Sequence, residues 1–381
     1  METINKLEVY LAGRHVGTIA PYQRYLTAFA YSDEWLQNGF SISPFSLPLT
    51  TGVKIARSDP FDGLFGIFMD SLPDGWNRLL MDRMLRKWGE NPDQITPLQR
   101  LSIVGDAGMG ALEYRPAGRR HDVQPVDDLD RLAEACRMIL GSGKSEDLDT
   151  LFAMGGSSGG ARPKVLLKLD DGEWIVKFPS SGDPDEIGRM EYEYNLCAKA
   201  CGIEIPEVRL FPSSNGTGYF GCRRFDRERT DAGEYRIHLA SASALLEVSH
   251  RVPSLDYSSL MALTWQLTKR AAELEKLFRL MCFNVYAHNR DDHSKNFSFL
   301  CDEGDWRLAP AYDLTYSNSI GGEHATTVAG EGRNPGLSHI LQVGKKAGIS
   351  ETKARQIAEE VRETVTERLG AWLTRDYPVR G

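Results

Sequence analysis

The segment HNRDDHSKNFSFL, residues 288–300, places several side chains that could do chemistry within a short stretch. Asp291 and Asn296 are five residues apart, with His293 between them. Apolar residues follow at alternate positions, which predicts a buried strand directly after the polar loop. A turn, DEGD, and a second strand, WRLAPAY, then lead to Asp313. Because two antiparallel strands return the chain to its starting level, we expect Asp313 to lie beside Asn296.

This order of residues suits phosphoryl transfer from ATP. Asp291 would accept or orient the hydroxyl proton of the acceptor, while Asn296 and Asp313 would hold Mg²⁺ on the phosphates. Carboxylate and amide oxygens are hard ligands of the kind that Mg²⁺ prefers. The segment is therefore a candidate catalytic loop.

Upstream segments contain the phosphate-binding loop and the cation that such a site needs. The stretch GGSSGGARPK is rich in glycine, so its backbone N–H groups can approach an anion closely. Lys177 lies in IVKFP, on the strand that follows, and it points away from its apolar neighbours and into a cleft if they face the core. Glu191, on the next helix, is a natural ion-pair partner for Lys177. The glycines of the loop are Gly155, Gly156, Gly159 and Gly160.

Each of these features alone has an ordinary structural explanation. A Gly-rich loop is usually a flexible turn, Lys177 could be an edge-strand lysine, and Glu191 could be a solvated helix residue. The polar run at 291–293 could cap a helix. The ordered set favours a nucleotide-binding, kinase-like site, because a motif gains weight from its structural context.

Three regions of the chain would position these residues. Residues 1–115 read as a small α+β unit, in which KLEVYLAGRHVGTIA predicts a hairpin around a Gly-Arg turn. A helix in this unit has Asp74 as its predicted N-cap and Gly89 as its predicted C-cap. The polar stretch GRRHDVQPVDD is a candidate boundary.

The other two regions differ in their predicted secondary structure. Residues 120–235 predict an amphipathic helix and then a sheet with one inserted helix. Residues 236–381 read as mostly helical, and the final helix has Ser350 as its predicted N-cap. Its apolar face consists of Ala354, Ile357, Ala358, Val361 and Val365.

Composition is that of an ordinary globular protein. The chain has 381 residues, a net charge of −8 and 41% hydrophobic residues. This acidity argues against a surface built mainly to hold nucleic acid. The six cysteines form no CxxC pair, which indicates reduced thiols. With no signal-peptide pattern and no apolar run of ~20 residues, we expect a cytoplasmic protein that does not contact the membrane.

The motifs resemble those of the HipA kinases, the toxin halves of bacterial HipBA toxin–antitoxin pairs. NRDDHSKNFS resembles their catalytic loop, SSGGARPK their Gly-rich loop, RRFDR the segment that joins their lobes, and PAYDL their metal-binding motif. The N-terminal stretches GRHVGTIA, SLPL, SLPDGWNR and SIVGDAGMGALEY are similar too, so the resemblance covers nearly the whole chain. It implies an α+β, protein-kinase-like bilobal fold with an added N-terminal α+β subdomain and a mostly helical C-terminal lobe.

The resemblance also implies activity and partners. The activity is that of an ATP- and Mg²⁺-dependent serine/threonine protein kinase, and some relatives act on aminoacyl-tRNA synthetases. The implied partner is a small HipB-like helix-turn-helix antitoxin, through which alone the complex would bind operator DNA. Asp291 would be the catalytic base, Asn296 and Asp313 would bind the metal, and Glu191 would pair with the lysine. The implied ATP-binding residues are Gly159, Gly160, Ala161, Lys164, Lys177, Arg223, Phe225, Asp226, His293 and Lys295.

The resemblance further implies that a serine before the Gly-rich loop can be autophosphorylated, which ejects the loop and stops the kinase. The matching residue here is Ser157. Ser158 follows it where relatives often carry an apolar residue, so either serine is a candidate acceptor. Simple loop flexibility is the competing explanation for both.

Two other functions remain open at this stage. One is a small-molecule phosphotransferase of the aminoglycoside-phosphotransferase type, which shares the Asp–x4–Asn loop. The other is a corepressor that mainly stabilises an operator complex, with kinase activity secondary. We expect residues 1–115 to lie outside the nucleotide site, and a chain beginning near residue 120 to bind ATP if it folds.

Overall fold

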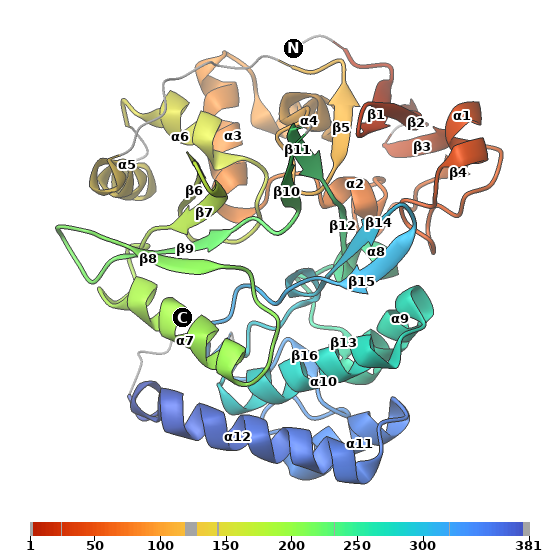
Figure 1. The fold of residues 1–381 in the computed structure, drawn as a ribbon. Helices are drawn as coiled ribbons and strands as arrows, with labels where there is room; N and C mark the ends of the chain where they lie inside the picture. The colour runs from red at the N-terminus through yellow and green to blue at the C-terminus, as the bar shows by residue number, and fades with distance from the viewer. Residues whose placement is uncertain are drawn as a thin grey trace.

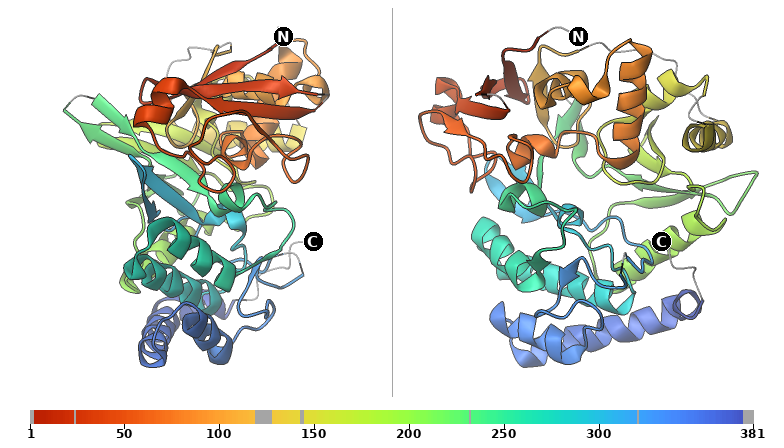
Figure 2. Two further views of the ribbon diagram at one scale, coloured as in Figure 1. Left: turned by 90° about the vertical axis from the view of Figure 1, so that its right-hand side faces the viewer. Right: turned by 180° about the vertical axis from the view of Figure 1, so that it is seen from behind.

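The computed structural model describes residues 3–23, 25–118, 128–142, 145–231, 233–319 and 321–375. Over these ranges the N-terminal sheet lies at one end of the molecule and the C-terminal helices lie at the other (Figure 1). Figure 2 shows the same arrangement from two further sides. The predicted boundary GRRHDVQPVDD falls largely on residues 119–127, outside the described residues.

The N-terminal unit is built on a five-stranded sheet with the order β4-β3-β2-β1-β5. The predicted hairpin is present, with Leu7 opposite Ile19. Its turn lies one residue earlier than the Gly-Arg pair, because Ala12 and Gly13 take the positive φ values and Arg14 already belongs to the second strand. The strands are β1 Leu7–Leu11, β2 Arg14–Tyr22, β3 Leu26–Tyr31, β4 Lys54–Ile55 and β5 Leu112–Arg115.

Short helices cover this sheet and lead toward the rest of the molecule. Asp74 caps the third of them as predicted, because its carboxylate accepts a hydrogen bond from Gly75 N at 2.8 Å. That helix ends at Lys87 with Trp88 as its C-cap, and Gly89 follows in the left-handed region at φ +81°. The helices are α1 Asp33–Asn38, α2 Gly66–Met69, α3 Gly75–Lys87, the 3-10 turn η1 Pro92–Gln94 and α4 Pro97–Val104.

The middle region contains a four-stranded antiparallel sheet with the order β6-β7-β9-β8. One helix, α7, lies between β7 and β8 in the chain, as the sequence predicts. The strands are β6 Lys164–Leu169, β7 Gly172–Lys177, β8 Val208–Phe211 and β9 Tyr219–Arg223, followed by the hairpin β10 Arg227–Thr230 and β11 Gly233–Arg236. The helices are α5 Leu129–Ser142, α6 Leu148–Gly155 and α7 Ile187–Ala200.

The C-terminal region is mostly helical, and α12 runs along its base (Figure 1). Ser350 caps α12 as predicted, and the five predicted apolar positions of this helix are all buried. The helices are α8 Ala242–Leu246, α9 Tyr257–Thr268, α10 Ala271–Tyr286, the 3-10 turn η2 Ser294–Asn296, α11 Leu337–Lys346 and α12 Glu351–Leu373. The strands are β12 His238–Ser241, β13 Leu255–Asp256, β14 Ser298–Asp302, β15 Asp305–Leu308 and β16 Thr326–Thr327.

The hydrophobic core is shared between the regions. One cluster of buried side chains extends from Leu7 in β1 to Trp372 in α12. A second cluster joins Trp76 and Leu80 of α3 to Val176 of β7. The N-terminal unit therefore shares its core with the rest of the chain, and the division at 1–115, 120–235 and 236–381 stays a prediction.

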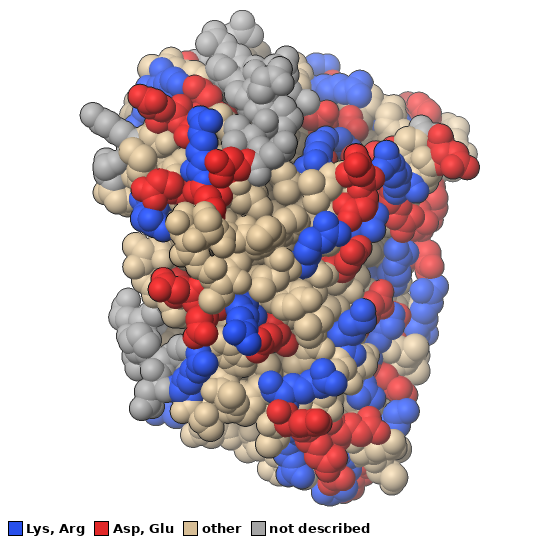
Figure 3. Space-filling model, turned by 60° about the vertical axis from the view of Figure 1, so that its left-hand side comes forward, with Lys and Arg blue, Asp and Glu red and all other residues tan. Residues whose placement is uncertain are grey.

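The surface and the cysteines agree with an ordinary globular chain. On the face in Figure 3, basic and acidic side chains are interspersed around a largely uncharged centre. All six cysteines are buried and carry free thiols. Among the described residues, no helix is both long and apolar enough to cross a bilayer.

His238 links the N-terminal unit to the C-terminal region through a buried contact. Its Nε2 lies 2.8 Å from the carbonyl oxygen of Ile42, and its ring packs against Phe40 and Trp306. Burial lowers the pKa of His238 from 6.5 to about 4. The unfolded chain therefore takes up a proton on this ring below about pH 6.5, whereas the folded chain does so only near pH 4.

We expect acid to destabilise the fold through His238. The stability that the neutral ring contributes is complete above pH 6.5 and is lost as the pH falls toward 4. The loss between pH 7.5 and pH 5 should be about 2 kcal/mol. Urea unfolding of the wild type and of His238→Gln at both pH values measures how much of the loss in unfolding free energy is due to His238. Burial also lowers the pKa of His288 and His293. Both histidines are present in the wild type and in His238→Gln, so their effect cancels in the comparison. An equal pH dependence of the two proteins would contradict the assignment.

Candidate active site

Lys177 connects three segments of the chain through its contacts: strand β7, helix α7 and the PAYDL segment that contains Asp313. It ends β7, and its neighbours Val176 and Phe178 are buried on the opposite side, as the alternation predicts. Its Nζ lies 2.5 Å from Glu191 Oε1 and also forms an ion pair with Asp313. Glu191 is only 1% exposed. The lysine–glutamate pair expected from the sequence is therefore present, and Asp313 is its third member.

Lys177 and Asp313 stabilise each other's ionised forms. Burial by itself would lower the pKa of Lys177, but Asp313 and Glu191 raise it above its ordinary value. Burial by itself would raise the pKa of Asp313, but Lys177 and Lys164 hold it below its usual range. Both groups are charged at neutral pH, so the candidate site contains a fixed cation and a fixed anion.

The two adjacent aspartates of the catalytic loop have different surroundings. The Asp291 side chain is 62% exposed, whereas Asp292 is fully buried. Asp292 accepts hydrogen bonds from Tyr257 Oη at 2.8 Å and from His324 Nδ1 at 2.9 Å, so it anchors the loop. Asp291 is left as the carboxylate that a substrate can reach. The five-residue spacing to Asn296 also indicates Asp291, and not Asp292, as the candidate catalytic residue.

The surroundings of Asp291 favour its neutral, protonated form. The surrounding protein limits its hydration and raises its pKa, and the negative charges of Asp313 and Asp292 add to this effect. His293 opposes the shift, and its Nε2 lies 4.0 Å from Asp291 Oδ1. Asn296 donates its amide to Asp291 O at 2.7 Å, which fixes the loop.

The hairpin β14–β15 brings Asp313 to this loop. Asp302 pairs with Asp305 at its end, and the returning chain places Ala309 N 2.8 Å from Ser298 O. Tyr312 Oη then donates to Lys295 O at 2.5 Å. The hairpin register and this contact confirm that the chain returns to the catalytic loop, and the position of Asp313 beside Asn296 stays a prediction. Asp313 itself has φ +54°.

The Gly-rich loop lies between α6 and β6. Its exposed part consists of Gly159, Gly160 and Ala161, whose backbone is accessible to a ligand. Lys164 follows at the start of β6, pairs with Lys177 across the sheet and bonds through its Nζ to Gly159 O. It is only 4% exposed, and burial lowers its pKa to about 8. The two lysines thus place two positive charges next to the Gly-rich loop.

Arg162 belongs to the same network and was missed by the sequence prediction. Its guanidinium lies 3.3 Å from Glu191 and 3.2 Å from Asp183. Glu191 therefore holds both Arg162 and Lys177. The sequence signal was present, since Arg162 lies within GGARPK, but a local motif does not show which carboxylate an arginine reaches.

Both candidate acceptor serines are buried against the N-terminal unit. Ser157 is 3% exposed and its Oγ accepts from Met109 N at 2.9 Å. Ser158 is 6% exposed and its Oγ accepts from Asn77 Nδ2 at 3.0 Å. Residues 1–115 therefore pack directly on the Gly-rich loop, and the expectation that they are not themselves the nucleotide site stays a prediction.

The N-terminal unit also reaches the catalytic loop. Lys295 Nζ lies 3.5 Å from Asp74 Oδ2, and His250 Nε2 lies 2.9 Å from the same oxygen. The His250 ring in turn packs against His293 at a centroid distance of 5.4 Å. The bond to His250 is the main reason that the pKa of Asp74 lies below its usual range, although burial opposes it. Asp74 was predicted only as a helix cap.

The segment that joins the lobes requires one correction. Arg223 pairs with Glu207 at 3.4 Å and Phe225 packs against Tyr312, at a depression of about 460 Å³ that both residues line. Asp226, predicted to reach the ribose, is fully buried. Its carboxylate accepts from Arg224 at 2.7 Å, from Arg227 at 3.1 Å and from Gly110 N at 2.6 Å. These contacts occupy Asp226, so it is removed from the nucleotide set.

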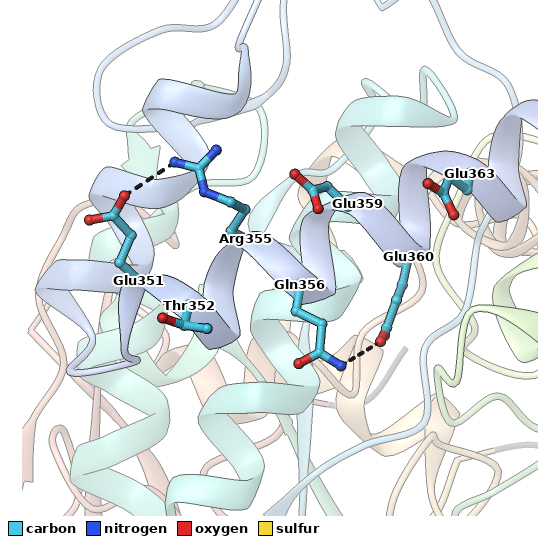
Figure 4. Close-up of a pocket in the computed structure, with 7 residues that line it drawn as sticks. All are labelled: Glu351, Thr352, Arg355, Gln356, Glu359, Glu360 and Glu363. Atoms are coloured by element: carbon cyan, nitrogen blue, oxygen red, sulfur yellow. Dashed lines mark hydrogen bonds and ion pairs between the residues drawn. The ribbon is translucent and has the colours of Figure 1, made fainter.

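A larger depression lies on the surface of α12 (Figure 4). Its carboxylates are partly paired within the helix, since Arg355 contacts Glu351 at 3.2 Å and Gln356 contacts Glu360 at 2.8 Å. This is the pattern of a solvated helix face with neighbouring charges three and four residues apart. The candidate chemistry stays with Lys177, Asp313 and the catalytic loop.

The fold is of the protein-kinase-like α+β class, with an added N-terminal sheet. Residues 156–369 match the HipA-like C-terminal domain, and residues 7–115 match the HipA N-terminal domain. The chain belongs to the HipA family.

Known proteins are similar over nearly the full length. A structure titled as the HipA, HipB and operator DNA complex of Shewanella oneidensis MR-1 has a TM-score of 0.72 at 16% identity, covering 98% of this chain and 92% of that one. "Putative kinase Y4mE" of Sinorhizobium fredii is 29% identical over 92% of this chain and 84% of its own length. "Putative kinase Y4dM" of the same organism is 22% identical over 98% and 92%.

Proposed function

We propose that the protein is an ATP- and Mg²⁺-dependent serine/threonine protein kinase that acts as the toxin of a type II toxin–antitoxin pair. The observation that carries this proposal is the ion-paired set Lys177, Glu191 and Asp313 beside the accessible carboxylate Asp291. These groups are the parts that phosphoryl transfer needs, in the chain order of a kinase. Membership of the HipA family and the names of the relatives support it.

The residues present fit a magnesium ion bound together with the nucleotide. Asn296 uses its amide N–H on Asp291 O, which leaves its amide oxygen as the atom that can bind a cation. Asp313, the other proposed ligand, stays ionised. Mg²⁺ is usually held by one or two side-chain oxygens plus substrate phosphates, and when bound it neutralises the charge that develops on the transferred group.

The other groups have separate roles in the proposed mechanism. Lys177 and Lys164 attract the phosphates, and the exposed backbone of Gly159 and Gly160 lies against them. Arg223 and Phe225 border the adenine base of ATP, while His293 and Lys295 contact the nucleotide from the catalytic loop. Asp291 accepts the proton of the acceptor hydroxyl, and its raised pKa brings it closer to the value that suits a general base.

The proposed partners follow from the relatives. The Shewanella structure holds HipA with HipB and operator DNA, so we propose a HipB-like helix-turn-helix antitoxin as partner and operator DNA as a contact of that complex. The substrate is a protein, with an aminoacyl-tRNA synthetase as one candidate class, and the location is the cytoplasm. ATP consumption measured with synthetases, casein or aminoglycosides as acceptors tests the activity. Transfer only to an aminoglycoside would replace it with a small-molecule phosphotransferase. ATP binding with no transfer would favour the corepressor.

Autophosphorylation in the Gly-rich loop is expected to slow the kinase with time. Ser157 is held by one backbone N–H, whereas Ser158 bonds to Asn77 through both its Oγ and its carbonyl oxygen. Ser157 is therefore the easier one to release. A phosphate adds about −1.5 to −2 charges, which cannot return to a buried site made for a hydroxyl, so the loop should stay out.

Intact-mass analysis after incubation with Mg·ATP checks this prediction. Ser157→Ala should delay the modification and the loss of activity, and Ser157→Ala with Ser158→Ala should remove both. If no phosphate appears on residues 155–160 while a protein acceptor is being modified, the switch is absent from this protein.

A further inference from the structure

One short segment of the N-terminal unit lies between the two loops that form the candidate active site. Residues 74–77 begin helix α3, in the sequence DGWN. They contact the Gly-rich loop on one side and the catalytic loop on the other. The motifs that carry the chemistry lie downstream of residue 155, so this segment is an addition to the kinase parts.

The contacts with the Gly-rich loop are made by backbone and side chain together. Trp76 N donates to Gly160 O at 3.0 Å. Asn77 Nδ2 donates to Ser158 O at 2.8 Å and to Ser158 Oγ at 3.0 Å, and Asn77 is only 3% exposed. Gly75 has φ +49°, and a Cβ atom there would lie 2.2 Å from Gly160 O. The backbones thus approach so closely that only glycine fits.

The contact with the catalytic loop is electrostatic. Asp74 Oδ2 lies 3.5 Å from Lys295 Nζ and 2.9 Å from His250 Nε2. The side chains of Asp74 and Lys295 are 18% and 14% exposed, so water screens this pair less than it screens a surface pair. Lys295 lies between Asp291 and Asn296 in the chain, so its position and that of the two site residues are linked.

Helix α3 is a rigid support for these contacts. Trp76 and Leu80 are each 1% exposed and pack in the same cluster as Val165 of β6 and Val176 of β7. The segment therefore cannot move away from the sheet that carries Lys164 and Lys177 without breaking that core. A group held on a packed helix positions its partners more accurately than one on a free loop.

We propose that Asp74 and Asn77 are positioning residues for phosphoryl transfer. Asn77 holds the Gly-rich loop down over the phosphates, and Asp74 holds Lys295 and with it the catalytic loop. The N-terminal unit is then a clamp, which sets the distance between the bound nucleotide and the catalytic base Asp291. The inference about catalysis rests on the proposed kinase function, but the clamp itself can be measured without it.

Two substitutions separate the two contacts. Asp74→Asn keeps a side chain that caps a helix as well as aspartate does but removes the charge that faces Lys295. Asn77→Leu keeps the approximate volume and removes the donor to Ser158. Matched controls are Asp33→Asn and Asn38→Leu, which make the same changes at exposed positions of helix α1 in the same unit.

Hydrogen–deuterium exchange on the full-length chain without nucleotide reads the clamp directly. Asn77→Leu should speed exchange in residues 156–163, and Asp74→Asn should speed it in residues 289–296, while α12 and both controls stay as in the wild type. Steady-state kinetics reads the catalytic consequence. A misplaced reacting group costs up to about 10²-fold, so we expect kcat/KM to fall between about tenfold and 10²-fold. The fall should appear mainly in KM for ATP with Asn77→Leu and mainly in kcat with Asp74→Asn.

The outcomes distinguish the clamp from the kinase function. Unchanged exchange in both loops overturns the clamp whatever the activity. Faster exchange in the variants together with an inactive wild type supports the clamp and overturns the kinase proposal. Faster exchange with wild-type kinetics overturns the positioning role.

Discussion

Asp291→Asn should lower the rate of phosphoryl transfer by about 10²–10⁴-fold while ATP binding stays near that of the wild type. The physical reason is that Asp291 is the exposed carboxylate of the loop and that its hydrogen bond from Asn296 uses the backbone carbonyl. The substitution therefore removes a base but leaves the loop anchored through Asp292. Calorimetric titration with Mg·ATP and a single-turnover transfer assay measure the two effects separately.

The pH profile gives a second measure of the same assignment. Because the pKa of Asp291 is raised, its carboxylate is protonated over a wider acidic range than that of an ordinary aspartate. The wild-type rate should rise with pH as the base form appears, and this acid limb should be absent from the residual activity of the variant. Near-wild-type turnover in Asp291→Asn would show that the catalytic loop has been assigned wrongly.

The sequence predicted the parts of the site that depend on local order. Strand alternation placed Lys177 opposite buried Val176, and the hairpin after Asn296 returned Asp313, because both follow from the geometry of neighbouring residues in strands. The spacing to Asn296 singled out Asp291, but the sequence did not show that Asp292 is its buried anchor. That role depends on Tyr257 and His324, which are distant in the chain.

The errors come from contacts between distant segments. Asp226 was assigned to the ribose by resemblance, yet Arg224 and Arg227 enclose it and Gly110 of the N-terminal unit bonds to it. The segment at Asp74 and Asn77 was interpreted as the start of a helix and as part of the family resemblance, but its contacts with the two loops were not predicted. Neither arrangement has a period or a spacing that a sequence can display, since each depends on how the N-terminal unit packs on the sheet. For the same reason, a chain that begins near residue 120 would lack the groups that hold both loops.

Asp313→Asn should remove most of the magnesium dependence of ATP binding. Asp313 is a carboxylate that pairs with Lys177, one of the lysines proposed to bind the phosphates, and Lys177 and Lys164 keep it ionised. Asparagine is the clean replacement because Asp313 has φ +54°, a conformation in which asparagine is enriched and alanine is strained. The variant keeps an oxygen ligand but loses the negative charge, and it leaves Lys177 paired with Glu191.

Titrations with Mg²⁺ and with a chelator present decide the role. In the wild type Mg²⁺ should tighten ATP binding strongly. In Asp313→Asn the affinity for ATP in the presence of Mg²⁺ should fall by at least about 10–100-fold. Losing a group that only supports a metal ligand costs this much, and here a direct ligand has lost its charge. Affinity without Mg²⁺ should stay the same or rise, because a carboxylate that repels the phosphates has gone. Glu191→Gln is the matched control, since it also removes one carboxylate from Lys177 but should keep the magnesium dependence. Equal loss of magnesium dependence in both variants would mean that Asp313 acts only through Lys177 and does not hold the metal.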